Sequence, residues 1–276
     1  MEKFMSYFET IPSSHRSLIL ICGIAFFWLL EYAIPLFSFS YKKVQHAGIN
    51  IFFTLTTVIV NFVLAFLLLK TSDFTVTYQI GIMQWMKAPL WLEVFVGILF
   101  LDLIGAWLAH YTEHKVKVLW GFHLIHHTDH HVDTTTANRH HPGESVIRFA
   151  FTCLGVLVVG APVGVIMLYQ ALSVIASQFN HANIALPKKV DQMLSWVIVS
   201  PNMHKIHHHY MLPYTDSNYG NIFSIWDRIF GTFYKMNKED IVYGVDTYPD
   251  ELANSHLGKL LKMPFNPYKS PEKKIE

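Results

Sequence analysis

Histidine is the residue type whose spacing in this chain most clearly suggests chemistry. Fourteen of the 17 histidines fall between residues 110 and 209. His110 and His114 are four residues apart, so a helix would place both side chains on one face. The pattern H-x-x-H-H occurs twice and would also bring three imidazoles to one side of a helix. The two triplets are His123, His126 and His127, and His204, His207 and His208.

Imidazole nitrogens are ligands for zinc, copper, iron and nickel. Eight histidines with helical spacing are more than a single ion takes, so the sequence predicts two bound metal ions. The two triplets repeat one spacing in a chain that has few charged residues. This repetition favours a metal centre over eight unrelated surface histidines.

The elements that position these histidines are expected to lie in a membrane. Only 15% of the 276 residues are charged and 52% are hydrophobic, whereas a soluble domain has about 25% charged residues. This composition excludes a disordered chain, a disulfide-stabilised scaffold and an ordinary soluble enzyme. The net charge of +1 gives no reason to expect nucleic acid as a partner.

Three segments are long and apolar enough to span a bilayer, which requires about 20 residues. They cover residues 17–39, 51–69 and 89–109. A fourth apolar stretch, 146–177, is interrupted by Gly160, Pro162 and Gly164, which predicts a kinked hairpin with arms of 14 to 15 residues. We therefore expect an all-α integral membrane protein with about four transmembrane helices and a helical cap that holds the metal site.

The basic residues predict how the chain is oriented. If the loop at 40–50, the segment 110–148 and all residues after 180 share one side, that side holds 17 of the 21 Lys and Arg residues. The positive-inside rule then places the histidines and the C-terminus on the cytoplasmic side. The expected divisions are a three-span region at 1–109, a histidine-rich catalytic region at 110–232 and a cytoplasmic tail at 233–276.

Together with neighbouring motifs, the histidines resemble the fatty acid hydroxylase/sterol desaturase superfamily of membrane di-iron oxidoreductases. The resemblance continues through TTANRHHP at 135–142, DSNYG at 216–220 and WDRIFGT at 226–232. It covers about half of the chain. One departure is Tyr111, where many members have arginine directly after the first histidine.

The resemblance implies about ten metal-binding histidines and two iron ions, with zinc as a possible substitute in purified protein. His141, directly before Pro142, and His181 are the best matches for the ninth and tenth ligands. No catalytic residue apart from the metal ligands is expected, and no organic cofactor. His130, His131 and His140 receive no definite role, and neither does Glu31.

Two acidic residues are expected to support the ligands. An acid within a span is costly and usually functional. Asp102 lies two helical turns before His110, so it is predicted to accept an imidazole N–H and thereby fix the tautomer of a ligand. Asp227 is predicted to act in the same way, although a capping or ion-pair role is equally compatible with its position.

The implied activity is oxidation of a lipid C–H bond by dioxygen, for which a metal is required. Hydroxylation is favoured, but desaturation and ether cleavage of a sterol, fatty acyl chain or alkylglycerol share the ligand set. The chain has no C-x-x-C pair, no haem signature and no G-x-G-x-x-G. A separate electron carrier, cytochrome b5-like or ferredoxin-like, is therefore expected together with its reductase.

Two other classes of protein remain as alternatives. Residues 110–114 also read H-x-x-E-H, a zinc peptidase pattern in which Glu113 would be the general base. This interpretation leaves both triplets without a role. A non-enzymatic metal transporter is the third possibility, but transporters bind near the bilayer midplane, and these histidines lie at the ends of spans and beyond.

Overall fold

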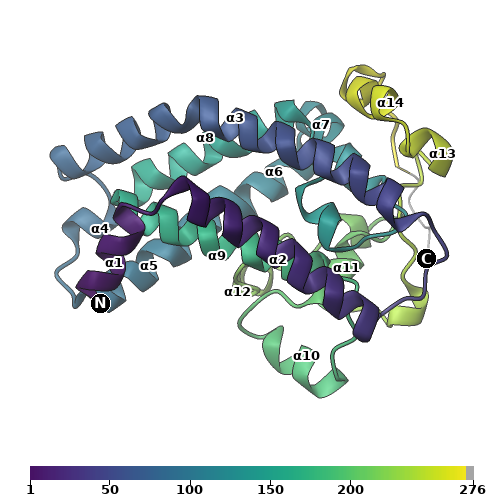
Figure 1. Cartoon of the computed structure of the whole chain (residues 1–276), viewed down its shortest axis with the longest axis horizontal. Helices are drawn as coiled ribbons and strands as arrows, with labels where there is room; N and C mark the ends of the chain where they lie inside the picture. Colours follow the sequence, from purple (N-terminus) through teal and green to yellow (C-terminus); the bar gives the residue numbers. More distant parts are fainter. Residues whose placement is uncertain (272–276) are drawn as a thin grey trace.

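The molecule is built around long apolar helices (Figure 1). The computed structural model describes residues 1–271, and these residues form helices and loops without a sheet. Five helices are long and apolar enough to cross a membrane. Four of them are α2 (Ser13–Ala33), α3 (Lys43–Thr77), α8 (Pro142–Val159) and α9 (Val163–His181). The remaining one is a continuous helix, Leu90–Lys115, which consists of α5 (Leu90–Asp102), a π-helical segment (Leu103–Leu108) and α6 (Ala109–Lys115).

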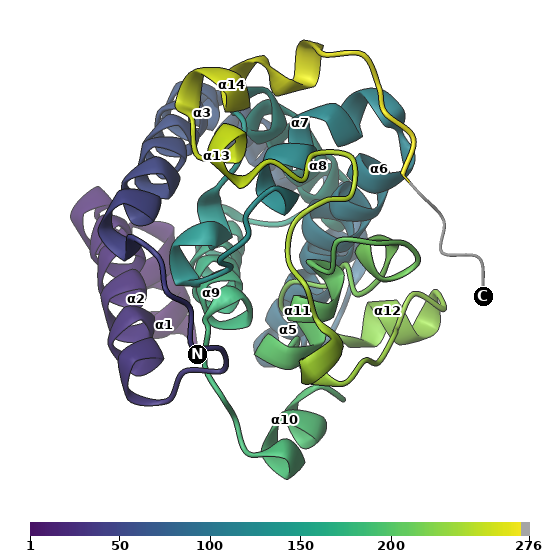
Figure 2. The same cartoon turned by 90° about the vertical axis from the view of Figure 1, so that its right-hand side faces the viewer.

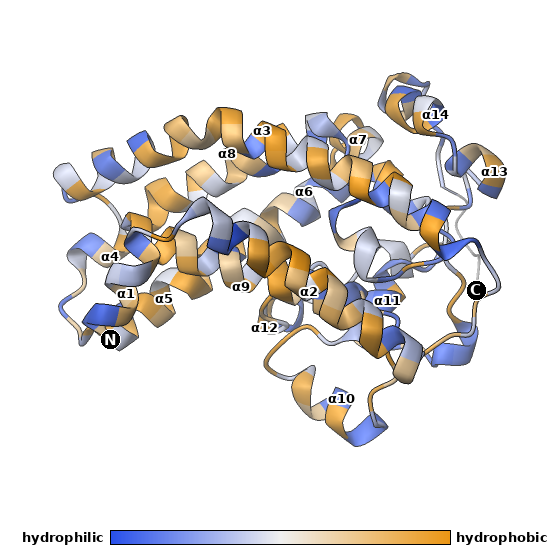
Figure 3. Cartoon of the chain, viewed as in Figure 1, coloured by the Kyte–Doolittle hydropathy of each residue, from blue (hydrophilic) through white to orange (hydrophobic). Residues whose placement is uncertain are grey.

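The outer faces of these helices are apolar, as Figure 3 shows. Leu29 on α2 is 70% exposed and Phe62 on α3 is 82% exposed. Rows of such side chains are unfavourable in water and favourable against lipid chains. A lipid-facing bundle of α-helices agrees with the fold predicted from the sequence.

The first predicted span ends earlier than expected. Helix α2 stops at Ala33 rather than continuing to residue 39. Ile34 precedes Pro35, and a residue before proline is disfavoured in the helical conformation. Ile34 accordingly leaves the helix with φ −138° and ψ 60°.

The predicted hairpin is present, but its arms are longer than expected. Gly160 ends α8 in the left-handed conformation, with φ +69°, and Pro162 precedes α9. The arms have 18 and 19 residues because α8 begins at Pro142 and α9 continues to His181. Both arms are therefore long enough to span a bilayer, which gives five candidate spans instead of about four.

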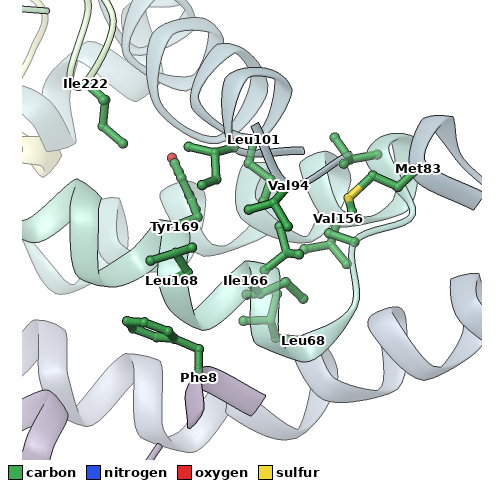
Figure 4. Packing of buried hydrophobic residues seen from close by; sticks show 14 of the residues in the cluster. Phe8, Leu68, Met83, Val94, Leu101, Val156, Ile166, Leu168, Tyr169 and Ile222 are labelled. Atoms are coloured by element: carbon green, nitrogen blue, oxygen red, sulfur yellow. The ribbon is translucent and has the colours of Figure 1, made fainter. Parts of the chain in front are cut away.

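Buried apolar side chains hold α5, α8 and α9 together (Figure 4). Leu101, Val156 and Ile166 come from these three helices, and all are inaccessible to solvent. Phe8 from α1 (Glu2–Glu9) and Leu68 from α3 join the same cluster. At the far end of the bundle, α4 (Ile82–Trp85) follows α3. This apolar core fixes the helices whose ends carry several of the histidines.

Shorter elements close one end of the bundle (Figure 2). Val116 has an extended conformation and separates α6 from α7 (Lys117–His127), so the chain changes direction between two histidine-bearing helices. The remaining elements at this end are η2 (Thr134–Asn138), α10 (Lys188–Leu194), α11 (Pro201–His207), η3 (Tyr214–Asp216), α12 (Ile225–Ile229), η4 (Lys238–Asp240), α13 (Glu251–Asn254), α14 (Leu257–Lys262) and η5 (Met263–Phe265).

Candidate metal centre

Nine histidines meet in two adjoining groups at the end of the bundle. Within each group, one nitrogen from every member lies within 4.8 Å of the others, and all nine residues are buried. The first group contains His110, His114, His123, His127 and His207. The second group contains His126, His181, His204 and His208.

The two H-x-x-H-H triplets each contribute to both groups. On α7, His123 and His127 belong to the first group and His126 to the second. At α11 the division is reversed, since His204 and His208 belong to the second group and His207 to the first. Neighbouring helical residues point about 100° apart, so adjacent histidines face different groups. Each triplet therefore joins the two groups.

The Nδ1 atoms of five grouped histidines are held by hydrogen-bond acceptors. Nδ1 of His110 lies 2.9 Å from the carbonyl oxygen of Tyr219. Nδ1 of His123 lies 2.7 Å from Oε1 of Glu144. The other three Nδ1 atoms with such partners are those of His114 (Asp216 Oδ1, 3.1 Å), His181 (Ser177 carbonyl, 2.7 Å) and His207 (Ser217 carbonyl, 2.6 Å).

These contacts determine which nitrogen carries the proton. A carbonyl or carboxylate oxygen can only accept, so Nδ1 donates and Nε2 of the neutral ring keeps a free lone pair. Yet Nε2 of His110 lies only 3.0 Å from Nε2 of His123, with two lone pairs facing each other. Nε2 of His114 and His207 is buried without a hydrogen-bond partner in the described chain. Lone pairs in this arrangement are suited to binding metal cations.

The protonation states fit the same conclusion. Burial lowers the pKa of His123, His126 and His127 well below the ordinary value, and neighbouring imidazoles lower it further. Burial has the same effect on the pKa of His204, His207 and His208. These rings are therefore neutral near pH 7, which is the form that binds a metal. An all-imidazole donor set of this size fits two first-row transition metal ions.

The two acidic residues bind backbone N–H groups rather than imidazoles, which differs from the expectation for Asp102 and agrees with the capping alternative for Asp227. Asp102 contacts no imidazole, and its oxygens accept the backbone N–H groups of Ile222 and Phe223 at 3.1 Å each. Asp227 accepts the N–H groups of Tyr219 at 2.8 Å and Gly220 at 2.9 Å. Both carboxylates thus hold the loop at 219–223. They reach the metal centre through the Tyr219 carbonyl that His110 contacts.

His141 lies outside both groups, although it was expected to be a ligand. It precedes Pro142 at the start of α8, where its Nδ1 accepts the N–H of Gly143 at 2.9 Å and caps the helix. His140 lies nearer to the centre. Its ring stacks on that of His126 with centroids 4.9 Å apart, and its Nδ1 is 2.6 Å from Oε1 of Glu144.

Within the described residues, Glu31 contacts none of the nine grouped histidines but holds segments that lie beside them. Its carboxylate accepts the backbone N–H groups of Thr134 at 2.7 Å and Asn183 at 3.0 Å, and it pairs with Lys43 at 2.8 Å. It therefore ties α2 to η2 and to the segment after His181. His130 and His131 also belong to neither group.

A buried network beside the first group could not be recognised from the sequence patterns. Arg148 on α8 lies between two carboxylates, 2.8 Å from Glu113 and 3.0 Å from Glu144. Glu113 is therefore paired with a guanidinium, which argues against its role as a free general base in a peptidase. The sequence carries only a weak signal for this network. Glu144 lies four residues after His140, at the start of an apolar stretch.

Comparison with known proteins gives the family. The model of the family described as fatty acid hydroxylase matches residues 94–232, which contain all nine grouped histidines. The ornithine lipid hydroxylase OlsE of Rhizobium tropici is 26% identical over 151 residues, covering 55% of this chain and 44% of that protein. No solved structure matched the chain.

Alkylglycerol monooxygenases are similar to the same extent. The protein of Xenopus tropicalis is 27% identical over 176 residues, covering 62% of this chain and 36% of that protein. The protein of Caenorhabditis elegans is 28% identical over 170 residues, covering 60% of this chain and 32% of that protein. The chain thus matches less than half the length of each of these relatives. Because the family model spans half of the chain and the whole histidine centre, the chain belongs to the fatty acid hydroxylase family.

Proposed function

We propose that this protein is a membrane-bound di-iron oxygenase that hydroxylates a C–H bond of a lipid, using dioxygen and external electrons. The observation that carries this proposal is the convergence of nine buried imidazoles in two adjoining groups at the end of an apolar bundle. The names of the relatives, an ornithine lipid hydroxylase and alkylglycerol monooxygenases, support a lipid substrate and insertion of oxygen.

The nine grouped histidines would hold two iron ions, one ion in each group. Bound iron would supply activation of dioxygen and oxidation of a C–H bond, which acid and base side chains cannot carry out. The protein itself would contribute by positioning the imidazole rings and by keeping water away from them. The Nδ1 acceptors of His110 and His123 fix the orientation of these rings, and burial of the groups excludes water.

The electrons would come from a separate carrier of the cytochrome b5 or ferredoxin type, supplied by its own reductase. A pocket of about 240 Å³ on the surface supports a docking place for it. Lys117 and Lys269 line this pocket, and Trp120 forms part of its wall. The ring of Trp120 lies 4.8 Å from that of His114 and 5.3 Å from that of His127, measured between centroids.

Charge reversal at Lys117 and Lys269 tests this docking place. The double variant should bind the soluble domain of cytochrome b5, or a ferredoxin, more weakly in a titration at low salt. Charge reversal of Lys235 and Lys238, which are exposed and do not line this pocket, is the matched control and should leave the affinity unchanged. Equal effects of the two double variants would contradict docking at the Trp120 pocket.

The distribution of Lys and Arg supports a cytoplasmic position of the metal centre. A cysteine introduced at Glu239, which is exposed near the histidine end, should react with an impermeant maleimide only after cells are opened. The background for this variant lacks Cys22 and Cys153. Labelling of intact cells would overturn the proposed orientation.

Elemental analysis is the first test of the proposed activity. Protein made in iron-replete medium and purified without air should contain two irons per chain. Replacement of His110 or of His204 by alanine should lower the metal content, since these residues belong to different groups. A single zinc that is lost only with the His110 variant would favour the peptidase.

Incubation with reduced carrier and ¹⁸O₂ then tests the reaction itself. Ornithine lipid and alkylglycerol are the first substrates to try, in view of the named relatives. Hydroxylation adds one labelled oxygen atom to the lipid, whereas desaturation removes two hydrogen atoms and adds no oxygen. Absence of both products from iron-loaded protein with every lipid tested would contradict the proposed function.

A further inference from the structure

The elements on either side of α11 expose a set of large apolar side chains. Met193 at the end of α10 is 72% exposed and Trp196 is 65% exposed. We call the whole set the cap patch: Val190, Met193, Trp196, Val197, Ile225, Ile229 and Phe230. Monomeric soluble surfaces seldom collect so many large apolar groups, so the cap patch requires an explanation.

The two stretches of the cap patch form one connected surface. The carbonyl oxygen of Ser195 accepts hydrogen bonds from Oγ of Ser224 at 2.6 Å and from the guanidinium of Arg228 at 2.8 Å. That guanidinium also lies over the ring of Trp196, 4.1 Å from its centroid. These contacts fix the segment after α10 against α12, so the exposed apolar groups are held in place together.

The cap patch continues the lipid-facing surface of a membrane helix. On α5, Phe95 is 49% exposed, and its ring lies 6.3 Å from that of Phe223, just before α12. The ring of Phe230 in the cap patch stacks on Trp107, 4.4 Å between centroids, in the helix that continues α5. Two separate aromatic contacts therefore connect this candidate span with the segment that carries part of the cap patch, and Phe223 packs against the cluster that contains Trp107.

Helix α10 has the pattern of a segment that lies along a membrane surface. Val190 and Met193 are spaced i and i+3 on α10 and share one face, with the exposed Lys189 beside Met193 and the exposed Gln192 on another face. Val197 follows in the turn after the helix. Figures 1 and 3 show α10 beside the bundle rather than within it, with both hydrophilic and hydrophobic residues along its length. Lysine, arginine and tryptophan at the edge of an apolar surface are typical of the bilayer interface.

We propose that the cap patch is embedded in the interfacial layer of the same bilayer that the long helices cross. The region after residue 185 is then not a wholly aqueous cap. Helix α11, which carries His204 and His207, follows α10 after a short segment. Embedding α10 would hold the histidine groups beside the lipid surface, so that a lipid chain could reach them without crossing water.

Nitroxide labels can measure this embedding directly, whether or not metal is bound. Three single cysteines are introduced separately into a chain in which Cys22 and Cys153 are replaced by alanine. The labelled positions are Met193 in the cap patch, Phe62 on the outer face of α3 as the lipid reference, and Glu239 as the water reference. The proteins are placed in nanodiscs of phosphatidylcholine and phosphatidylglycerol, and power saturation compares collision with oxygen and with a water-soluble nickel chelate.

The expected result is a ratio of oxygen to nickel accessibility at residue 193 that is severalfold higher than at residue 239. A ratio at residue 193 equal to that at residue 239 would overturn the proposal, since the cap patch would then face water. Low accessibility to both reagents, with an immobilised spectrum, would also overturn it. That outcome would assign the cap patch to a protein contact, such as a second copy of this chain.

Discussion

His123 and Glu144 form a contact of 2.7 Å between Nδ1 and Oε1, fully buried between α7 and the start of α8. The same carboxylate oxygen lies 2.6 Å from Nδ1 of His140 and 3.0 Å from Nε of Arg148. Arg148 in turn pairs with Glu113, one residue before His114. A charged network at the start of a membrane helix thus orients a histidine of the first group.

Replacement of Glu144 by glutamine is expected to weaken metal binding by about 10- to 100-fold, the usual effect of losing the partner of a ligand histidine. The amide keeps the shape but offers a poorer acceptor to His123 and leaves Arg148 with one carboxylate fewer. Titration with a competing chelator measures the affinity. Glu93→Gln, near the start of another membrane helix, is the matched control and should bind metal as the wild type does.

Asp227 is predicted to stabilise the loop that carries the Tyr219 carbonyl. Its carboxylate accepts N–H groups from Trp107, Tyr219 and Gly220. Asp227→Asn replaces one acceptor oxygen with a donor, which should cost about 1 to 3 kcal/mol of folding free energy. The melting temperature in detergent should fall, and Asp73→Asn at an exposed site should leave it unchanged. An unaltered melting temperature for Asp227→Asn would contradict the role assigned to this carboxylate.

The adjacent residues His140 and His141 should respond differently to substitution. His141→Asn is expected to keep full metal content, because asparagine can also cap α8 and His141 belongs to neither group. His140→Asn is expected to lower metal affinity, since His140 contacts Glu144 and stacks on His126. Elemental analysis of both variants gives the comparison. Loss of metal from His141→Asn alone would restore His141 as a ligand.

The gathering of each histidine triplet on a helix could be predicted from the sequence because helix geometry is local. Spacings of three and four residues bring side chains together wherever the helix lies. The division of each triplet between two groups depends on how α7 and α11 meet. That arrangement is set by contacts between residues about 80 positions apart, so no local spacing of His126 or His207 could indicate it.

Asp102 shows why a helical pattern can mislead. Asp102 and His110 lie on one continuous helix that includes a π-helical segment, Leu103–Leu108. Eight residues rise about 12 Å along a helix axis, so the carboxylate cannot reach the imidazole even when both side chains point to the same side. Asp102 therefore faces the 219–223 loop. The expectation for His141 did not anticipate its capping role, because the start of α8 at Pro142 became clear only from the structure.

Asp133 connects η2 to α3 and to the loop before it. Its carboxylate accepts from the N–H of Thr135 at 2.8 Å and from the hydroxyl of Tyr41 at 2.8 Å. Burial by itself would raise the pKa of Asp133, but hydrogen bonds from His46 and Thr135 outweigh it and lower the pKa below its ordinary value. Ionised Asp133 therefore stabilises the folded state.

A carboxylate whose pKa is lower in the folded chain contributes its full stabilisation above the unfolded pKa, about 3.9 for aspartate. Asp133→Asn should accordingly lower the melting temperature at pH 7. The difference in melting temperature between variant and wild type should narrow as the pH falls below about 4, because the Asp133 carboxylate of the unfolded wild type binds a proton there, and the folded one does so only at lower pH. Melting curves of both proteins across this pH range, recorded without bound metal, measure the difference in melting temperature. A difference in melting temperature that does not change with pH would show that the charge of Asp133 does not stabilise the fold. Only the shape of the side chain and its neutral hydrogen bonds would then matter.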